Sequence, residues 1–156
     1  MKVQFENRKN TLIVLSGIPA SGKSTFCSYL QANGMLVVSS DAIRKELFGD
    51  ESIQKAPNKV FKIAYNHMQE NGSKKFDCAF DATNLTTALR KKVISAMRPY
   101  YDFILCYYFQ PNLAECLERN SKRDRKVPEK VIEDMVQKFE IPTTEEGFDY
   151  VCKIRD

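Results

Sequence analysis

Residues 16–25 read SGIPASGKST, with two glycines five positions apart and a lysine and a serine directly after the second. Gly17, Gly22, Lys23 and Ser24 match the pattern G-x-x-x-x-G-K-[ST], in which glycine backbone N–H groups wrap a polyphosphate. In that pattern the lysine reaches phosphate oxygens and the hydroxyl is a ligand of Mg²⁺. A glycine turn in an α/β connection is the plain alternative, but such a turn requires neither Lys23 nor Ser24. The stretch therefore predicts a phosphate-binding loop.

The sequence on either side of this loop has the order that a phosphate-binding loop requires. The apolar run TLIVL at 11–15 predicts a strand, and KSTFCSYLQA at 23–32 predicts a helix with Phe26, Tyr29 and Leu30 at helical spacing. Strand, loop and helix are thus consecutive, and we expect ATP as the bound nucleotide and Mg²⁺ on Ser24. The residues expected to contact the nucleotide are Gly17, Ala20, Ser21, Gly22, Lys23, Ser24 and Thr25.

The rest of the chain alternates between strand patterns and helix patterns. Further apolar runs that predict strands lie at 35–40, 77–81, 103–109 and 147–154. Further helical patterns lie at 41–48, 57–70, 86–98, 111–120 and 128–139. In the helix at 86–98, Leu89, Val93 and Met97 are spaced for one apolar face. The alternation predicts an α/β fold whose mostly parallel sheet has about five strands, with helices on both faces.

Composition places the chain among globular proteins. Its 156 residues are 43% hydrophobic and 28% charged, which predicts one domain over residues 1–156. No apolar stretch reaches the length of a membrane span, and the first ten residues lack the pattern of an export leader. We therefore expect a cytoplasmic protein without a membrane partner. The net charge of +4 permits an anionic partner, and a homo-oligomer is compatible with the sequence.

Two acidic residues follow predicted strands, at the edge of the sheet where α/β proteins bind ligands. Asp41 and Arg44 lie three positions apart, so a helix would present both side chains on nearly the same face. The carboxylate could accept a proton from an attacking hydroxyl, and the guanidinium could hold a phosphate of the substrate. Alternatively, Ser40 or Asp41 only caps the helix and Arg44 is a surface partner.

Asp81 ends the apolar run at 77–81, where nucleotide-binding proteins place a carboxylate that helps to hold the water shell of the metal. The same residue could instead cap the next helix, as could Thr83, Asn84 or Thr86. Together with the carboxylate and guanidinium after the second strand, Asp81 and Asn84 make up the predicted substrate site.

The densest basic stretch runs from 119 to 130 and holds six Lys and Arg residues against two acids. It connects two predicted helices rather than forming a tail. Arg119, Arg123 and Arg125 are therefore candidates for a lid that closes on the transferred phosphate, because guanidinium groups match phosphoryl oxygens. A solvated charged surface is the alternative.

Four stretches together resemble the P-loop kinase domain of polynucleotide 5′-hydroxyl kinases, of both phage type and bacterial RNA-repair type. They are GIPASGKST at 17–25, SSDAIRKEL at 39–47, FDATNLT at 80–86 and ERNSKRDRKVPEKVIEDM at 118–135. The resemblance implies a P-loop kinase domain with an arginine-bearing lid. The implied activity is ATP-dependent transfer of the γ-phosphate to the 5′-hydroxyl end of DNA or RNA, in nucleic-acid end repair.

The resemblance also implies roles for individual residues. Lys23 and Ser24 would hold the ATP phosphates and Mg²⁺, and Asp41 would be the general base for the 5′-hydroxyl. Arg44 would contact the phosphate of the acceptor nucleotide, and Arg123 would touch the donor phosphates from the lid. The implied catalytic residues are thus Lys23, Asp41 and Arg123.

Some expectations remain open at this level. By the resemblance, Asp81 is either a ligand of the metal shell or a residue that orients Arg44, and the motif does not choose between the two. The 156 residues leave no room for the phosphatase domain that phage enzymes join to this kinase, so the sequence predicts phosphorylation alone. The alternatives are a kinase for a small metabolite or nucleoside hydroxyl, and a nucleotide-switched binding module without an acceptor.

Overall fold

The computed structural model of the protein describes residues 8–50, 57–124 and 126–154. Within these residues the strands are β1 (Thr11–Ser16), β2 (Leu36–Ser39), β3 (Cys78–Asp81), β4 (Phe103–Tyr108) and β5 (Tyr150–Lys153). The α-helices are α1 (Lys23–Ala32), α2 (Ser40–Phe48), α3 (Pro57–Ser73), α4 (Thr87–Met97), α5 (Leu113–Ser121) and α6 (Glu129–Lys138). Two short 3₁₀ helices are η2 (Arg98–Tyr100) and η3 (Thr144–Glu146).

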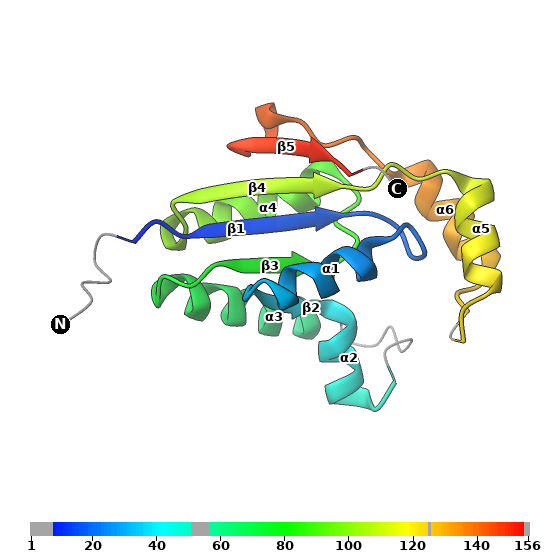
Figure 1. Cartoon of the computed structure of the whole chain (residues 1–156), viewed down its shortest axis with the longest axis horizontal. Coiled ribbons are helices and arrows are strands. Elements are labelled where there is room, and N and C mark those ends of the chain that lie inside the picture. The colour runs from blue at the N-terminus through cyan, green and yellow to red at the C-terminus, as the bar shows by residue number, and fades with distance from the viewer. Residues whose placement is uncertain (1–7, 51–56, 125, 155–156) are drawn as a thin grey trace.

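The strands form one sheet in the order β2-β3-β1-β4-β5, and every neighbouring pair is parallel (Figure 1). β1 lies at the centre, where Leu12 pairs with Cys78 of β3 on one side and with Ile104 of β4 on the other. A parallel strand needs cover on both faces, which is why the strand sequences are continuous apolar runs. The predicted fold class is confirmed.

Alternate residues of β1 serve two separate apolar layers. Leu12 and Val14 are fully buried in the layer that also contains core residues of α3 and α4, whereas Ile13 and Leu15 pack with Cys27 and Leu30 of α1 in another layer. Each fully buried aliphatic side chain contributes about 1.5–3 kcal/mol relative to exposure. Helices therefore cover both faces of the sheet, with α1 on one side and α3 and α4 on the other (Figure 1).

Two helices differ from the prediction. α3 continues to Ser73 instead of ending at 70, and Gly72 in its last turn allows the close approach of η2. A Cβ at position 72 would meet the Cβ and the carbonyl oxygen of Tyr100, each at 2.8 Å. On α4 the predicted face is right at Val93 and Met97, which are buried, and wrong at Leu89, which is 48% exposed. Arg90 is fully buried in place of Leu89.

The helices α5 and α6 lie beyond the carboxyl ends of the strands rather than on a face of the sheet (Figure 1). Ile132 of α6 and Cys116 of α5 are buried with Ile18 of the glycine loop and with Leu85, which follows β3. This third apolar cluster fixes the helix pair to the edge where the strands end. No helix within the described ranges is long and apolar enough to cross a membrane.

Candidate active site

The loop between β1 and α1 has the tight geometry that phosphate binding requires. The Gly17 N–H donates to the Thr83 carbonyl at 3.0 Å, and a Cβ at position 17 would meet Ser21 Oγ at 2.8 Å. Gly22 precedes α1 with a φ of 97°, a left-handed conformation that strains any other residue. The first turn of α1 holds no acidic residue. The partial positive charge of the helix N-terminus is therefore available to an anion.

Lys23, the first residue of α1, forms an ion pair across the end of the sheet. Its Nζ lies 2.7 Å from Asp81 Oδ1 at the end of β3, and the two side chains are 14% and 18% exposed. Cys27 lies one turn further along α1. Burial, and after it the Asp81 charge, raises the pKa of the Cys27 thiol to about 12. The thiol therefore stays protonated at neutral pH.

The carboxylate and guanidinium predicted on α2 do meet. Arg44 Nη1 donates to Asp41 Oδ1 at 3.1 Å, with the Arg44 side chain 10% exposed and that of Asp41 51% exposed. The cap of α2 is Ser39, whose Oγ accepts from the Ala42 N–H at 3.2 Å. Neither Ser40 nor Asp41 has that role, so the capping alternative does not account for Asp41.

The loop after β3 contains the residue that caps α4, for which the sequence offered four candidates. Thr86 caps α4, because its Oγ1 accepts from the Leu89 N–H at 3.3 Å. The Asn84 side chain is turned toward the sheet, where its Nδ2 donates to the Leu15 carbonyl at 2.7 Å, and the residue is 5% exposed. Asp81 is thus free of the capping role, and the Asn84 amide serves the backbone.

The α5–α6 connection carries arginines to the same edge of the sheet. Arg119 lies in the last turns of α5, and Arg123 follows that helix. Arg125 lies outside the described residues. The connection is closed by Asn120, whose side chain donates to the Val127 carbonyl at 2.7 Å and accepts from the Val127 N–H at 2.9 Å. This two-way contact, the Asn120 bracket, fixes the ends of the basic loop.

The predicted groups line one cavity of about 630 Å³, bounded by the glycine loop, α2, the end of β3 and the α5–α6 pair. The sequence-predicted residues on its wall are Ala20, Gly22, Lys23, Ser24, Thr25, Asp41, Arg44, Asp81, Arg119 and Arg123. Ser21 and Arg119 line a second cavity of about 370 Å³, next to residues that follow β4. Of the described residues that the sequence assigned, Gly17 and Asn84 line neither cavity.

Three buried polar atoms make no hydrogen bond within the described part of the chain, and all belong to side chains on these cavity walls. They are Ser21 Oγ, Arg44 Nε and Arg123 Nη1. Buried donors are normally paired, so unused donors on cavity walls fit a ligand rich in acceptor oxygens. Two of the three belong to guanidinium groups, which match phosphate geometry.

An apolar wall of the large cavity was missed by the sequence analysis. It consists of Phe61 on α3 together with Val131 and Met135 on α6. The Phe61 ring packs edge-on against Phe80 of β3, with 6.5 Å between centroids. The sequence placed these positions in the predicted helices 57–70 and 128–139, yet it could not show that two helices about 70 residues apart in sequence share a cavity.

The residues near Ser24 fit a hydrated Mg²⁺. Mg²⁺ in nucleotide sites keeps several waters and takes one or two protein oxygens together with phosphate oxygens. The Ser24 hydroxyl and the Asp81 carboxylate line the same cavity and supply oxygens of that kind. Within the residues that the structure describes, no group of three His, Cys, Asp or Glu side chains is arranged to hold a metal.

The glycine loop after the central parallel strand, with a helical lid over the strand ends, defines the fold of P-loop kinases. Residues 12–142 match a family model described as an AAA domain, and the chain belongs to that family. Membership of this kinase family supports a phosphotransferase activity. Kinases of the family use ATP, typically with Mg²⁺.

Individual relatives differ in what they act on. The chain is 28% identical over 150 residues to L-seryl-tRNA(Sec) kinase of Methanococcus maripaludis, covering 88% of this chain and 56% of that protein. It is 28% identical over 152 residues to the bifunctional polynucleotide phosphatase/kinase of Schizosaccharomyces pombe, covering 92% of this chain and 33% of that protein.

Among solved structures, a chain of the Pnkp1/Rnl/Hen1 RNA repair complex superposes with a TM-score of 0.77 at 24% identity. The match covers 92% of this chain and 47% of the other. At this level of identity the likeness concerns the fold. The chain thus spans about half or less of the length of these relatives.

Proposed function

We propose that this chain is a kinase that transfers the γ-phosphate of ATP to the 5′-hydroxyl end of a DNA or RNA strand. The observation that carries the proposal is the Asp41–Arg44 pair, 3.1 Å apart, on the wall of the cavity that also holds Lys23 and Ser24. A proton acceptor and a phosphate clamp would then face a phosphate donor within one cavity. That arrangement suits an acceptor hydroxyl with a phosphate nearby.

On the donor side, the chain would bind ATP through backbone N–H groups of the glycine loop and through Lys23. Binding of phosphate oxygens by Lys23 requires exchange of its Asp81 partner, and both side chains are accessible enough from the cavity for that exchange. Arg119 lies on the walls of both cavities, so the smaller cavity is the proposed place for the adenosine portion. A bound Mg²⁺ would neutralise charge on the β- and γ-phosphates.

On the acceptor side, Asp41 would take the proton of the attacking hydroxyl while that oxygen bonds to the γ-phosphorus. ADP then leaves with the electron pair of the broken P–O bond. Arg44, whose buried Nε lacks a partner among the described residues, would hold the phosphate next to the terminal nucleoside. Arg123 would stabilise the charge on the transferred group from the lid. Catalysis would consist mainly of positioning and electrostatic stabilisation.

The apolar wall favours a nucleic-acid end over a polyol as acceptor. Phe61, Val131 and Met135 offer contacts that a nucleobase can use, whereas a small polyhydroxylated substrate would leave them facing polar groups. The wall and the Arg44 clamp together match the two parts of a terminal nucleotide, its base and its phosphate.

The direct test is transfer of label from γ-labelled ATP, with Mg²⁺, to a 5′-hydroxyl oligonucleotide of DNA and of RNA. The same strand carrying a 5′-phosphate, a panel of nucleosides and seryl-tRNA are assayed in parallel. Label on the 5′-hydroxyl strands alone supports the proposal. Label on nucleosides or seryl-tRNA alone overturns the proposed substrate. Absence of label on every acceptor favours a nucleotide-switched binding module.

Two variants assign the roles. We expect Asp41→Ala to lower turnover about 10²- to 10⁴-fold, because it removes the proposed base and its contact with Arg44. ATP binding should be retained, because the glycine loop is unchanged. Glu46→Ala on the exposed face of the same helix is the matched control. Arg44→Ala should raise KM for an oligonucleotide more than KM for a nucleoside, since only the former carries the phosphate. Normal turnover of Asp41→Ala would overturn the assignment of Asp41 as the general base.

A further inference from the structure

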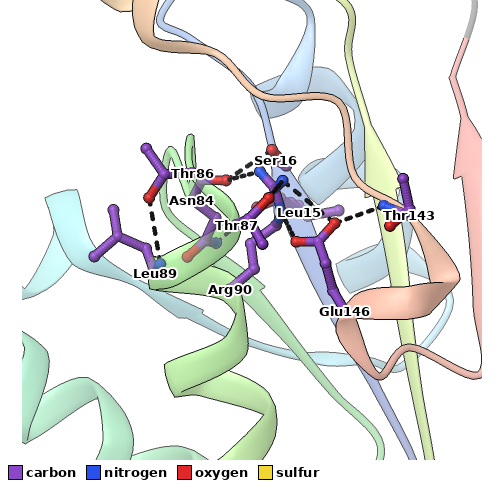
Figure 2. A network of polar contacts seen from close by, with 9 residues as sticks. All are labelled: Leu15, Ser16, Asn84, Thr86, Thr87, Leu89, Arg90, Thr143 and Glu146. Carbon is purple, nitrogen blue, oxygen red and sulfur yellow. Dashed lines mark hydrogen bonds and ion pairs between the residues drawn. The ribbon is translucent and has the colours of Figure 1, made fainter.

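The carbonyl of Asn84 collects two hydrogen bonds at the junction between β1 and the glycine loop (Figure 2). Ser16 Oγ donates to it at 2.9 Å from the last position of β1, and Arg90 Nη1 donates at 2.9 Å from α4. The Asn84 side chain adds the bond to the Leu15 carbonyl, and the residue has a φ of 43°. The loop at 82–86 is therefore fastened to the strand immediately before the phosphate-binding residues.

Arg90 is itself held by an acid from the far end of the chain. Its Nε lies 2.7 Å from Glu146 Oε1 and its Nη2 lies 3.4 Å from Glu146 Oε2, with the two side chains 0% and 3% exposed. Glu146 Oε2 also accepts from the Thr143 N–H at 2.6 Å (Figure 2). A buried ion pair is weak evidence for stability by itself, because desolvation offsets the attraction. Stability alone therefore does not explain why Arg90 is buried at this position.

The loop at 82–86 contacts the glycine loop, the large cavity and the segment after α6. Asp81, the partner of Lys23, directly precedes it, and Ala82 and Thr83 line the large cavity. The Leu85 carbonyl accepts from the Glu140 N–H at 2.9 Å, which ties the loop to the chain just after lid helix α6. Displacement of this loop would therefore move Asp81 and the end of the lid relative to the glycine loop.

We propose that Arg90 is a positioning residue for phosphoryl transfer. Held by Glu146, it fixes the Asn84 carbonyl and so sets the spacing between the glycine loop, Asp81 and the end of the lid. Arg90 lines neither cavity, so it would act through the loop at 82–86 rather than on a bound substrate. The inference rests on the phosphate transfer of the proposed function and is independent of which hydroxyl accepts the phosphate.

The test replaces the buried pair by uncharged residues of similar size, Arg90→Met together with Glu146→Gln. The glutamine keeps an oxygen for the Thr143 N–H, and neutral replacement of a buried pair is often tolerated in stability. We expect kcat to fall about 10- to 100-fold with KM for ATP nearly unchanged, because misplacement of groups slows chemistry more than binding. A folded double variant with the kcat of the original chain overturns the proposal.

A matched control is Arg98→Met. Arg98 holds the same C-terminal segment, since its Nη1 donates to Asp149 Oδ2 at 2.9 Å and its Nη2 donates to the Gly147 carbonyl at 2.5 Å. Loss of this anchor leaves the Asn84 carbonyl with both donors, so kcat should stay within about threefold of the original. An equal loss of kcat in Arg98→Met would mean that any loosening of the segment slows the reaction, and would overturn the specific role of Arg90.

Ser16→Ala covers the case in which the double variant does not fold. It removes only the other donor to the Asn84 carbonyl, and we expect kcat to fall about three- to tenfold with KM for ATP retained. An unchanged kcat in Ser16→Ala overturns the proposal. Two rates are measured: labelling of the oligonucleotide, and release of ADP when water accepts the phosphate in place of the oligonucleotide. If the original chain labels no oligonucleotide, the proposed function fails, and the ratio of ADP release rates still decides the role of Arg90.

Discussion

Two ion pairs, Lys23–Asp81 and Arg90–Glu146, have the same N–O distance but differ in their access to the large cavity. Asp81 precedes the loop at 82–86 in the sequence, and Arg90 follows it. Lys23 and Asp81, 2.7 Å apart, line the large cavity and remain partly exposed. Arg90 and Glu146, also 2.7 Å apart, are fully buried and have further hydrogen bonds to the backbone. A pair beside a cavity can exchange its partner for a ligand, whereas a buried and fully bonded pair cannot. The two pairs therefore have equal N–O distances, but only Lys23–Asp81 is placed to exchange a partner for a ligand.

The largest expected effect is a loss of stability when the buried pair is disrupted. Arg90→Met alone leaves Glu146 buried without its cation, which should lower the free energy of unfolding by about 3–5 kcal/mol. Denaturant unfolding followed by circular dichroism measures the change. Lys74→Met, which removes an exposed pair with Glu70, is the control and should change the free energy of unfolding by about 1 kcal/mol or less. An unaltered unfolding midpoint in Arg90→Met would show that burial of this pair carries no structural weight.

The converse is expected for the pair beside the cavity. Lys23→Met should lower kcat/KM about 10²- to 10³-fold, because it removes the cation that is proposed to bind the ATP phosphates. Asp81 stays in contact with the cavity, so the free energy of unfolding should change far less than in Arg90→Met. Steady-state kinetics and denaturant unfolding of the same preparation give both values. A large loss of stability would place Lys23–Asp81 with the structural pairs.

A third ion pair, Asp41–Arg44, depends on how α2 begins. Ser39 caps that helix through its side chain. Ser39→Ala should lower the free energy of unfolding by about 1 kcal/mol. It should also weaken acceptor binding more than ATP binding, since Asp41 and Arg44 lie in the first two turns. Kinetics at varied acceptor and at varied ATP separate the two effects, and an equal change in both KM values would argue against this reading.

The smallest effect concerns an exposed pair and appears only in acid. The hydrogen bond from Arg98, and then the one from the Ile104 N–H, holds the pKa of Asp149 below its ordinary value of 3.8. A lowered carboxyl pKa stabilises the fold above that ordinary value, and the stabilisation is lost as the pH falls below it. The difference in unfolding midpoint between the original chain and Asp149→Asn should therefore shrink in strong acid. A difference that does not vary with pH would contradict this account.

The sequence predicted the parts of the molecule in which local pattern and tertiary environment agree. Buried parallel strands are continuous apolar runs, so each strand was found close to its observed bounds. The glycine loop was found because its backbone geometry demands particular residues at particular spacings. Asp41 and Arg44 share a helix face, so spacing alone predicted that they meet, as they do at 3.1 Å.

The positions that the sequence did not predict depend on contacts between distant segments. In ALRKKV, Arg90 resembles the two lysines that follow it, and Leu89 was expected inside. What buries Arg90 is Glu146, 56 residues later, and no spacing connects the two. The Asn84 amide likewise faces a backbone carbonyl 69 residues earlier rather than the cavity. Such partners become visible only once the sheet order is known.

The Asn120 bracket has a consequence for how the lid tolerates change. Because the Asn120 side chain joins both ends of the basic loop at Val127, we expect the two lid helices to keep their contact when residues between these ends are replaced. The loop residues between Asn120 and Val127 can then change without a change in the packing of α5 against α6. Insertions, or a reporter dye at the exposed Asp124, should alter the loop's reach and charge while α5 and α6 stay in place. The Asn120 bracket would therefore let the loop between the lid helices vary while the positions of α5 and α6 are kept.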